Sequence, residues 1–284
     1  MIQNVCICGA GTMGTGITEL MARNGYYTTL YDLEQHALHK AATLIKNNLA
    51  QLVSKGKITG KESADAWSRI LFTTDLNHCI ADLVVEAIAE EVSAKIALFN
   101  QLAEINHSET VFTSNTSSIS VTAIAEKIPH PERIAGMHFF NPAQIMKLVE
   151  IVHTSFTSQE VVNQLLMVTE KTGKTAVVCK DSPGFIVNRV ARPFYLEALR
   201  LVEQEAAGIT DIDDLIESAG FRMGPFRLMD LIGNDINYAV SESLYESLNK
   251  PKRLQPSILQ LQKIQSGQLG KKTGKGYYDY TSNT

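Results

Sequence analysis

The feature that most constrains the fold is a glycine pattern close to the N-terminus. A short apolar run, Val5–Cys8, leads directly into Gly9-Ala10-Gly11-Thr12-Met13-Gly14, and a helical apolar pattern follows. Gly9 permits a tight turn, Gly11 removes a side chain that would block a phosphate, and Gly14 lets helix and strand pack closely. Thr12 and Met13 begin the helix, whose unpaired N–H groups and positive dipole end attract an anion. The pattern predicts a pyrophosphate site.

A second apolar run, Tyr27–Tyr31, supports this prediction because it ends in Asp32. A glycine pattern alone is often an ordinary turn, but a carboxylate at this offset is typical of the group that binds an adenosine ribose. Asp32 would also repel a 2′-phosphate, and neither Leu33 nor Glu34 supplies a cation to offset that repulsion. The sequence therefore predicts a dinucleotide site that prefers NAD to NADP.

Length and composition limit the alternatives. A chain of 284 residues suits two domains, and 44% hydrophobic with 20% charged residues is ordinary for a soluble globular protein. The net charge of −4 argues against general nucleic-acid affinity. The N-terminus enters a strand at once and no apolar run reaches membrane length, so we expect no signal peptide and no membrane span.

Cysteine usage favours a reducing cytoplasm. Cys6 and Cys8 lie on one face of the first strand and cannot pair there, while Cys79 and Cys179 stand far away along the chain. No spacing typical of a metal site is present, so we expect small core residues and no metal.

The first part of the chain alternates between strand-like and helical patterns. After Asp32, two helical stretches stand where a plain nucleotide-binding fold has a short crossover. Strand-like runs then recur and are separated in several places by helical patterns at 91–105 and 158–172. The two inserted helical stretches are 35–52 and 61–70, and the strand-like runs are Ile70–Thr73, Ala81–Ile88, Val111–Ser114, Ile134–Phe140, Lys147–His153 and Thr175–Lys180. This alternation predicts an α/β Rossmann-like domain with a mostly parallel sheet and an inserted helical pair.

The pattern changes at Asp181–Gly184, where Ser182 is a candidate helix cap and Pro183 suits a first turn. Beyond this point the chain is predicted to be helical at Phe185–Ala206, Ile212–Ser218, Phe226–Leu248 and Pro256–Gln265. We therefore expect an NAD-binding domain at 1–184 and an all-α domain at 185–284. The helical domain has apolar stripes with little to cover them, which favours a homodimer through this domain over a cap that closes only on its own first domain.

Candidate catalytic residues follow two of the predicted strands. His138 precedes an Asn141-Pro142 turn and Glu150 follows it, so the two side chains can face each other across a chain reversal. A histidine bonded to a buried carboxylate is a general base with a fixed tautomer, although a lone histidine in an apolar strand is usually structural. The polar segment Ser114–Ser120 is either part of the site or a capped turn.

These segments together resemble a known family, the short-chain 3-hydroxyacyl-CoA dehydrogenases. The resemblance runs the full length, and it is most specific in His138-Phe139-Phe140-Asn141-Pro142 and in Pro183–Arg189. Segment Gly220–Asp230 further resembles the branch associated with phenylacetate breakdown, which oxidises 3-hydroxyadipyl-CoA as well as, or instead of, 3-hydroxybutyryl-CoA.

The resemblance implies a role for each matching site residue. It makes His138 the catalytic base and Glu150 its partner. It makes Ser117 and Asn188 the residues that hydrogen-bond the reacting oxygen, and Asn115 a contact of cofactor or substrate. Asn188 belongs to the helical domain, so the resemblance implies a site that is complete only when the domains close.

The resemblance also implies ligand contacts outside the reacting centre. Glu90 and Lys95 correspond to residues that bind the nicotinamide-side ribose, with a surface ion pair as the alternative. Lys55 corresponds to a lysine that meets the phosphates of coenzyme A, but Gln51 departs from a basic residue that some members carry one helical turn earlier. Coenzyme A binding then either rests more heavily on the nearby lysines or is weaker, and the alternative for these lysines is a solvated face: Lys55, Lys57 and Lys61.

The sequence thus predicts a cytoplasmic, NAD-dependent L-3-hydroxyacyl-CoA dehydrogenase that acts on acyl-CoA. A β-hydroxyacid dehydrogenase acting on a free acid is a rival, opposed by the His138/Glu150 arrangement. A non-catalytic NAD-binding relative, like the lens crystallin of this fold, is a second rival. The basic tail Gly270–Tyr278 is either a phosphate loop or a turn that packs Tyr277 and Tyr278 on the helical domain. We expect the turn, and we expect Trp67 to be a packing residue.

Overall fold

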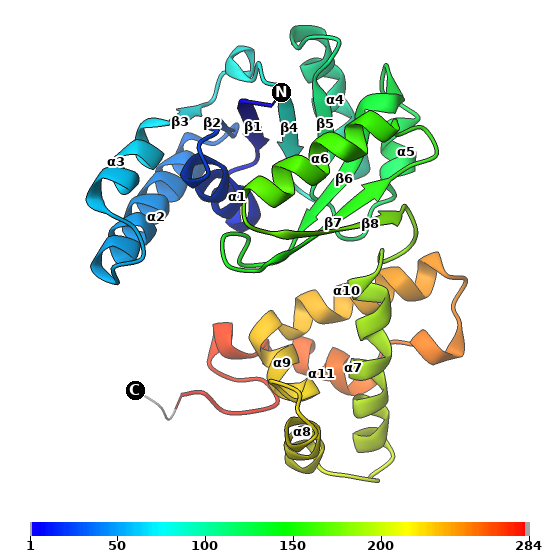
Figure 1. Cartoon of the computed structure of the whole chain (residues 1–284). Coiled ribbons are helices and arrows are strands. Elements are labelled where there is room, and N and C mark those ends of the chain that lie inside the picture. Colours follow the sequence, from blue (N-terminus) through cyan, green and yellow to red (C-terminus); the bar gives the residue numbers. More distant parts are fainter. Residues whose placement is uncertain (1, 282–284) are drawn as a thin grey trace. The chain divides into compact units, whose positions relative to one another are not determined.

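The computed structural model describes residues 2–281 and divides the chain into two compact units, Met1–Ser182 and Pro183–Thr284 (Figure 1). The first unit is an α/β unit built on one sheet, and the second consists of helices and turns. Among the described residues, no helix is both long and apolar enough to cross a lipid bilayer.

The first unit contains an eight-stranded sheet in the order β3-β2-β1-β4-β5-β6-β7-β8. Every neighbouring pair is parallel except β6 and β7, which are antiparallel. The strands are β1 (Asn4–Cys8), β2 (Tyr27–Tyr31), β3 (Ile70–Thr73), β4 (Leu83–Glu86), β5 (Val111–Ser114), β6 (Ile134–Phe139), β7 (Leu148–His153) and β8 (Thr175–Lys180). The sheet confirms the predicted Rossmann-like fold class. Its strand order reverses between β1 and β4, and ligands of such sheets bind beyond the strand ends at this point.

Helices cover both faces of the sheet because successive residues of a strand point to opposite faces. In β5, Val111 joins the large core cluster that includes α1 (Thr12–Arg23) and α6 (Gln159–Lys171). The next residue, Phe112, packs edge-on against Phe99 with ring centroids 5.9 Å apart. Phe99 lies in α4 (Val92–Ile105), and the short α5 (Val121–Ala125) packs beside it, so these helices cover the other face.

The inserted pair consists of α2 (Gln35–Ser54) and α3 (Gly60–Ser68). Thr59 and Glu62 form a capping box at the start of α3, which satisfies two backbone N–H groups that the helix leaves unpaired. A small cluster of its own holds the pair together, and Trp67 is part of that cluster as expected. Its ring lies 5.5 Å from that of Phe72 on β3.

The second unit packs five helices around a core of its own. They are α7 (Val187–Glu203), α8 (Ile209–Ser218), α9 (Pro225–Ile232), α10 (Asn234–Ser247) and α11 (Ile258–Gln265). The single helix predicted over Phe226–Leu248 is wrong, because α9 ends and α10 begins at Gly233. Gly233 has a φ of 105°, which a helix interior does not allow. The tail turn is confirmed, since Tyr277 and Tyr278 pack against this core.

The start of α7 also differs from the prediction. Ser182 and Pro183 do not begin the helix, because Gly184 and Phe185 have φ values of 72° and 48°. Two successive left-handed residues cannot continue into a right-handed helix, so α7 starts only at Val187.

Candidate active site

The glycine turn after β1 has the close packing and the open space that a diphosphate requires. A side chain at Gly14 would place its Cβ 1.8 Å from the Gly9 carbonyl oxygen, so only glycine fits there. A Cβ at Gly11 would meet nothing within 4 Å. Gly11 is the N-cap of α1 and offers no side chain to the first turn, so the N–H groups near Thr12 and Met13 face outward. These residues fit the pyrophosphate of NAD.

Asp32 lies just beyond β2 and is tied to the glycine turn. Its Oδ2 accepts a hydrogen bond from the Ala10 N–H at 2.6 Å, and its Oδ1 accepts one from the Glu34 N–H at 2.9 Å. The half-buried carboxylate therefore has a fixed orientation beside the turn.

A buried ionic network lies where β4 and β5 end. Glu86, the last residue of β4, is fully buried and accepts hydrogen bonds from Lys95 Nζ at 2.6 Å and Ser114 Oγ at 2.6 Å. Lys95 itself is only 1% exposed. Sequence reasoning assigned a ligand contact to Lys95 and no role to Glu86. An acid as the last residue of an otherwise apolar strand was the signal that it missed.

Glu90 continues this network toward the surface. Its Oε2 lies 3.2 Å from Lys95 Nζ, while its Oε1 accepts hydrogen bonds from Thr116 Oγ1 at 2.5 Å and Ser118 Oγ at 2.8 Å. Burial opposes ionisation, but the Thr116 hydroxyl, the Lys95 ammonium and the Ser118 hydroxyl outweigh it, so the pKa of Glu90 is lowered. Glu90, unlike Lys95, is the exposed member of this ion pair.

The loop after β5 carries Asn115 and Ser117. The Oδ1 of Asn115 accepts a hydrogen bond from the Phe139 N–H at 2.9 Å, which ties this loop to the residue after His138. The N–H of Ser117 lies 3.3 Å from Glu90 Oε1. The structure therefore brings the loop, the Glu90 carboxylate and the end of β6 together.

His138 and Glu150 are register partners on the antiparallel strands β6 and β7. Their Nδ1 and Oε2 atoms lie 2.7 Å apart, and the residues are 5% and 0% exposed. A cis peptide bond between Asn141 and Pro142 lies in the connection between the strands. With the Nδ1–H donating to a carboxylate, Nε2 becomes the accepting nitrogen of the ring. The ring of Phe140 lies 4.6 Å from that of His138.

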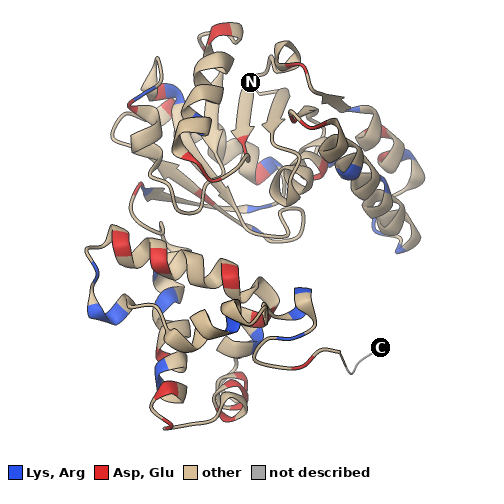
Figure 2. Cartoon of the chain, turned by 180° about the vertical axis from the view of Figure 1, so that it is seen from behind, with Lys and Arg blue, Asp and Glu red and all other residues tan. Residues whose placement is uncertain are grey.

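The remaining predicted site residues lie elsewhere. Asn188 is in the first turn of α7, within the helical unit. Lys55 is the exposed C-cap residue of α2, and Lys57 and Lys61 are exposed nearby. Figure 2 shows bands of basic residues along the α2–α3 pair, which also carries two acids, Glu62 and Asp65 of α3.

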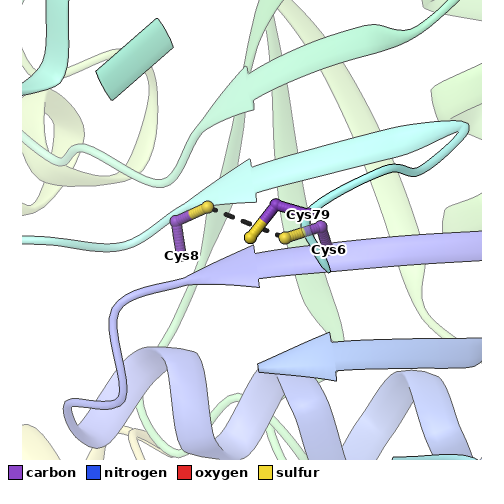
Figure 3. Close-up of side chains that lie close together, drawn as sticks. All are labelled: Cys6, Cys8 and Cys79. Atoms are coloured by element: carbon purple, nitrogen blue, oxygen red, sulfur yellow. Dashed lines mark hydrogen bonds between the residues drawn. The ribbon is translucent and has the colours of Figure 1, made fainter. Parts of the chain in front are cut away.

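The fold places Cys79, which is distant along the chain, beside Cys6 and Cys8 of β1, a proximity that residue spacing alone did not predict. The Sγ atoms of Cys6, Cys8 and Cys79 all lie within 4.8 Å of one another, and all three residues are buried (Figure 3). Hydrogen bonding among the thiols and burial raise the pKa of Cys6 and Cys8 well above its usual range. The hydrogen bonds with Cys6 and Cys8 lower the pKa of Cys79 to about 5, so the directions within the cluster oppose each other. That these cysteines are core residues that hold no metal stays a prediction.

Comparisons with known proteins identify the family of the chain. Residues 4–182 match the family "3-hydroxyacyl-CoA dehydrogenase, NAD binding domain", and residues 184–280 match "3-hydroxyacyl-CoA dehydrogenase, C-terminal domain". The chain is 47% identical over 281 residues to 3-hydroxyadipyl-CoA dehydrogenase of Escherichia coli, covering 98% of this chain. It is 38% identical over 285 residues to a probable 3-hydroxybutyryl-CoA dehydrogenase of Bacillus subtilis, covering 100% of this chain and 99% of that protein.

A solved structure is also similar. The crystal structure of 3-hydroxybutyryl-CoA dehydrogenase from Escherichia coli superposes with a TM-score of 0.97 at 46% identity, covering 100% of this chain and 61% of that one. This chain likewise spans only 59% of the length of the Escherichia coli 3-hydroxyadipyl-CoA dehydrogenase.

Proposed function

The chain belongs to the 3-hydroxyacyl-CoA dehydrogenase family, and we propose that it oxidises the 3-hydroxyl of an L-3-hydroxyacyl-CoA reversibly with NAD. The match of residues 4–182 identifies the cofactor as NAD. The single observation that supports the chemistry best is the buried pair at 2.7 Å, His138 with Glu150. We propose a short-chain substrate such as 3-hydroxybutyryl-CoA, in line with the name of the relative in Bacillus subtilis.

In the proposed mechanism, His138 removes the hydroxyl proton through Nε2. NAD, held by the glycine turn and Asp32, would supply the hydride acceptor for the carbon that carries this hydroxyl. Glu150 holds the Nδ1–H, fixes the tautomer and stabilises the imidazolium that forms. In the reverse direction the imidazolium returns its proton to the ketone oxygen. Because both side chains are buried, their attraction is weakly screened by water.

The other residues orient the reactants. We propose that Ser117 and Asn188 hydrogen-bond the reacting oxygen, with Asn115 a contact of cofactor or substrate. Holding the reacting atoms in this way contributes several kcal/mol to catalysis in enzymes generally. Ligand contacts outside the reacting centre are proposed for four residues: Asp32 with the adenosine ribose, Glu90 and Lys95 with the nicotinamide-side ribose, and Lys55 with the coenzyme A phosphates.

One assay tests the proposed function. Purified protein is mixed with NADH and acetoacetyl-CoA, and the loss of NADH absorbance is followed. We expect steady turnover with acyl-CoA and none with free acetoacetate. Turnover of the free acid alone would support a β-hydroxyacid dehydrogenase. NADH binding without turnover of any acyl-CoA would support a non-catalytic relative.

We also propose that the protein is a cytoplasmic homodimer formed through its helical unit. Large apolar side chains of that unit are exposed to solvent, among them Val190 (72%), Leu215 (70%) and Ile258 (69%). The described cysteines are unpaired, in keeping with a reducing compartment. Light scattering of the purified protein tests the dimer, and a monomeric mass would contradict it.

A further inference from the structure

Arg192 is a buried positive charge whose counter-charge is missing from the described chain. It lies in α7, is 3% exposed, and forms no ion pair with any described carboxylate. Burial lowers its pKa to about 10, and the phenol of Tyr195 is the one charge partner that opposes this. Buried charges are normally paired, because an unpaired one loses its hydration without compensation.

The guanidinium is fixed by one nitrogen only. Nη1 donates to the Asn237 carbonyl oxygen at 2.8 Å and to Ser241 Oγ at 2.9 Å, both on α10. Nε is buried without a hydrogen-bond partner, and Nη2 donates to none of the described residues. The edge formed by Nε and Nη2 is one that binds a carboxylate through two parallel hydrogen bonds.

The surroundings supply a further donor and no competing acid. The Nδ2 of Asn237 is also buried without a partner. The acids of α10 do not pair with it, since Glu242 and Glu246 are exposed and Asp235 pairs with Lys272. Asp230 is buried but accepts from the N–H groups of Tyr277 and Tyr278 instead. Gln260, whose Nε2 donates to Asn237 Oδ1 at 3.1 Å, has an Oε1 that also lacks a partner.

The spacing of Asn188 and Arg192 along α7 is compatible with an acyl group that carries polar groups at both its reacting carbon and its far end. Asn188 and Arg192 are separated by four residues, so they share a face of the helix about 6 Å apart along its axis. In an extended six-carbon acyl chain the terminal carbon lies roughly 4 Å beyond the reacting carbon. A residue that holds the reacting oxygen and an arginine one turn further can therefore contact the two ends of one acyl group.

We infer that Arg192 is a specificity-determining residue that binds the terminal carboxylate of a dicarboxylic 3-hydroxyacyl-CoA, the class to which 3-hydroxyadipyl-CoA belongs. The inference rests on the proposed function and on the role proposed for Asn188. It assigns the guanidinium edge of Nε and Nη2, with Asn237 Nδ2, to the carboxylate. A monocarboxylic acyl-CoA leaves this edge without a charged acceptor.

The test compares two substrates that differ only in the distal group, 3-hydroxyadipyl-CoA and 3-hydroxyhexanoyl-CoA. We expect wild type to prefer the former in kcat/KM. Arg192→Met is expected to lower kcat/KM for 3-hydroxyadipyl-CoA about 10- to 150-fold, the range for hydrogen bonds to a charged group, and to change it less than about 3-fold for 3-hydroxyhexanoyl-CoA. Arg200→Met, in the same helix but paired at the surface with Glu197, is the matched control and should change neither.

Binding provides a readout that does not depend on turnover. Calorimetry with adipyl-CoA and hexanoyl-CoA, which lack the reacting hydroxyl, should show the same selectivity and its loss in Arg192→Met. If Arg192→Met does not fold, Arg192→Lys replaces it, and an intermediate loss confined to the dicarboxylic ligand is expected because lysine keeps the charge without the two-pronged edge.

Several outcomes would overturn the inference. Equal losses on both substrates would make Arg192 a structural residue whose free edge bonds buried water. A change of oligomeric state without a change of selectivity would place its counter-charge on a second copy of the chain. Wild-type turnover of both substrates at equal kcat/KM would remove the carboxylate site but keep the dehydrogenase. No turnover of any acyl-CoA would instead contradict the proposed function, while the binding comparison would still decide on Arg192.

Discussion

The buried charges nearest the proposed reacting residues are matched in the first unit and unmatched in the helical unit. In the first unit the buried carboxylate Glu86 has the Lys95 ammonium at 2.6 Å, and the buried Glu150 has His138 at 2.7 Å. In the helical unit the buried Arg192 has neutral partners only. Near the proposed reacting residues, the first unit thus pairs its buried charges within the chain, whereas the helical unit leaves Arg192 for a ligand or partner to match. Elsewhere in the first unit, Arg133 and Lys174 are also buried, and among the described residues backbone carbonyls are their only acceptors.

The largest expected effect is a loss of turnover on replacement of His138, without a loss of cofactor binding. We expect His138→Gln to lower kcat about 10²- to 10⁴-fold, because a general base is lost, while NADH affinity stays nearly unchanged. Stopped-flow turnover and NADH fluorescence titration measure the two quantities. Activity close to wild type would show that this matched pair is structural like Glu86–Lys95, and the proposed base would be lost.

The next prediction compares the loss of stability when a paired buried charge is removed with the loss when an unpaired one is removed. Lys95→Met leaves the Glu86 carboxylate buried beside hydroxyl and amide donors alone, and should lower the free energy of unfolding by about 3–5 kcal/mol. Arg192→Met should cost clearly less, because it removes a charge that is unpaired. Urea unfolding of both variants compares them, with the exposed Lys61→Met as control. A larger loss for Arg192→Met would invert the comparison between the units.

A smaller effect is expected at Asp32, whose carboxylate accepts hydrogen bonds from the backbone N–H groups of Ala10 and Glu34. Asp32→Ser combined with Leu33→Arg should lower NAD affinity about 10- to 100-fold and shift preference toward NADP, because charge-assisted bonds to the ribose are exchanged for a cation. Calorimetric titration with both nucleotides measures the shift. An unchanged preference between NAD and NADP would mean that Asp32 only accepts the hydrogen bond from the Ala10 N–H and does not bind the ribose.

The exposed lysines should matter less. Lys55→Ala is expected to raise KM for acetoacetyl-CoA about 2- to 5-fold, since exposed ion pairs contribute only about 0.2–1 kcal/mol. The increase should shrink at high salt, where such charges are screened. Lys40→Ala removes an exposed lysine of the same helix and serves as control. Equal KM changes in both variants would mean that the lysines of α2 attract coenzyme A only through their combined positive charge, and that Lys55 makes no specific phosphate contact.

The smallest expected effect is a pH dependence at Glu90. Its pKa is lowered in the folded chain, so its ionised form contributes stability above the unfolded pKa of about 4.3. That contribution is lost as pH falls through the folded value. The difference in Tm between wild type and Glu90→Gln should therefore narrow below about pH 4.5. A gap that widens on acidification would contradict the sign of this shift.

The sequence was sufficient for the α/β fold class, because glycine spacing and strand periodicity are local signals. The dinucleotide site could be predicted from the positions of Gly9–Gly14 and Asp32 in the chain alone. The two errors at α7 and at Gly233 concern backbone conformations at single residues, which apolar periodicity does not report. Phe185 in a left-handed conformation has no signature in composition at all.

Long-range contacts were harder to predict. Cys79 joins Cys6 and Cys8 only because the loop after β3 returns to β1, and Glu86 meets Ser114 only because β4 and β5 are neighbours. Arg192 escaped notice because an arginine in an amphipathic helix is ordinarily solvated. Its importance comes from an absence of acids around it, which depends on five helices at once.

The reversal of direction at β7 has a consequence for how the site tolerates change. His138 and Glu150 meet because they oppose each other across one ladder, where alternate residues point to alternate sides. A slip of β7 by one residue would send the carboxylate to the far side of the sheet and leave the imidazole facing Ile151 or Val149. A register fault would therefore remove the proposed base pair and also bury the Glu150 carboxylate unpaired in the apolar cluster of Val149 and Ile151, so it should cost both activity and stability.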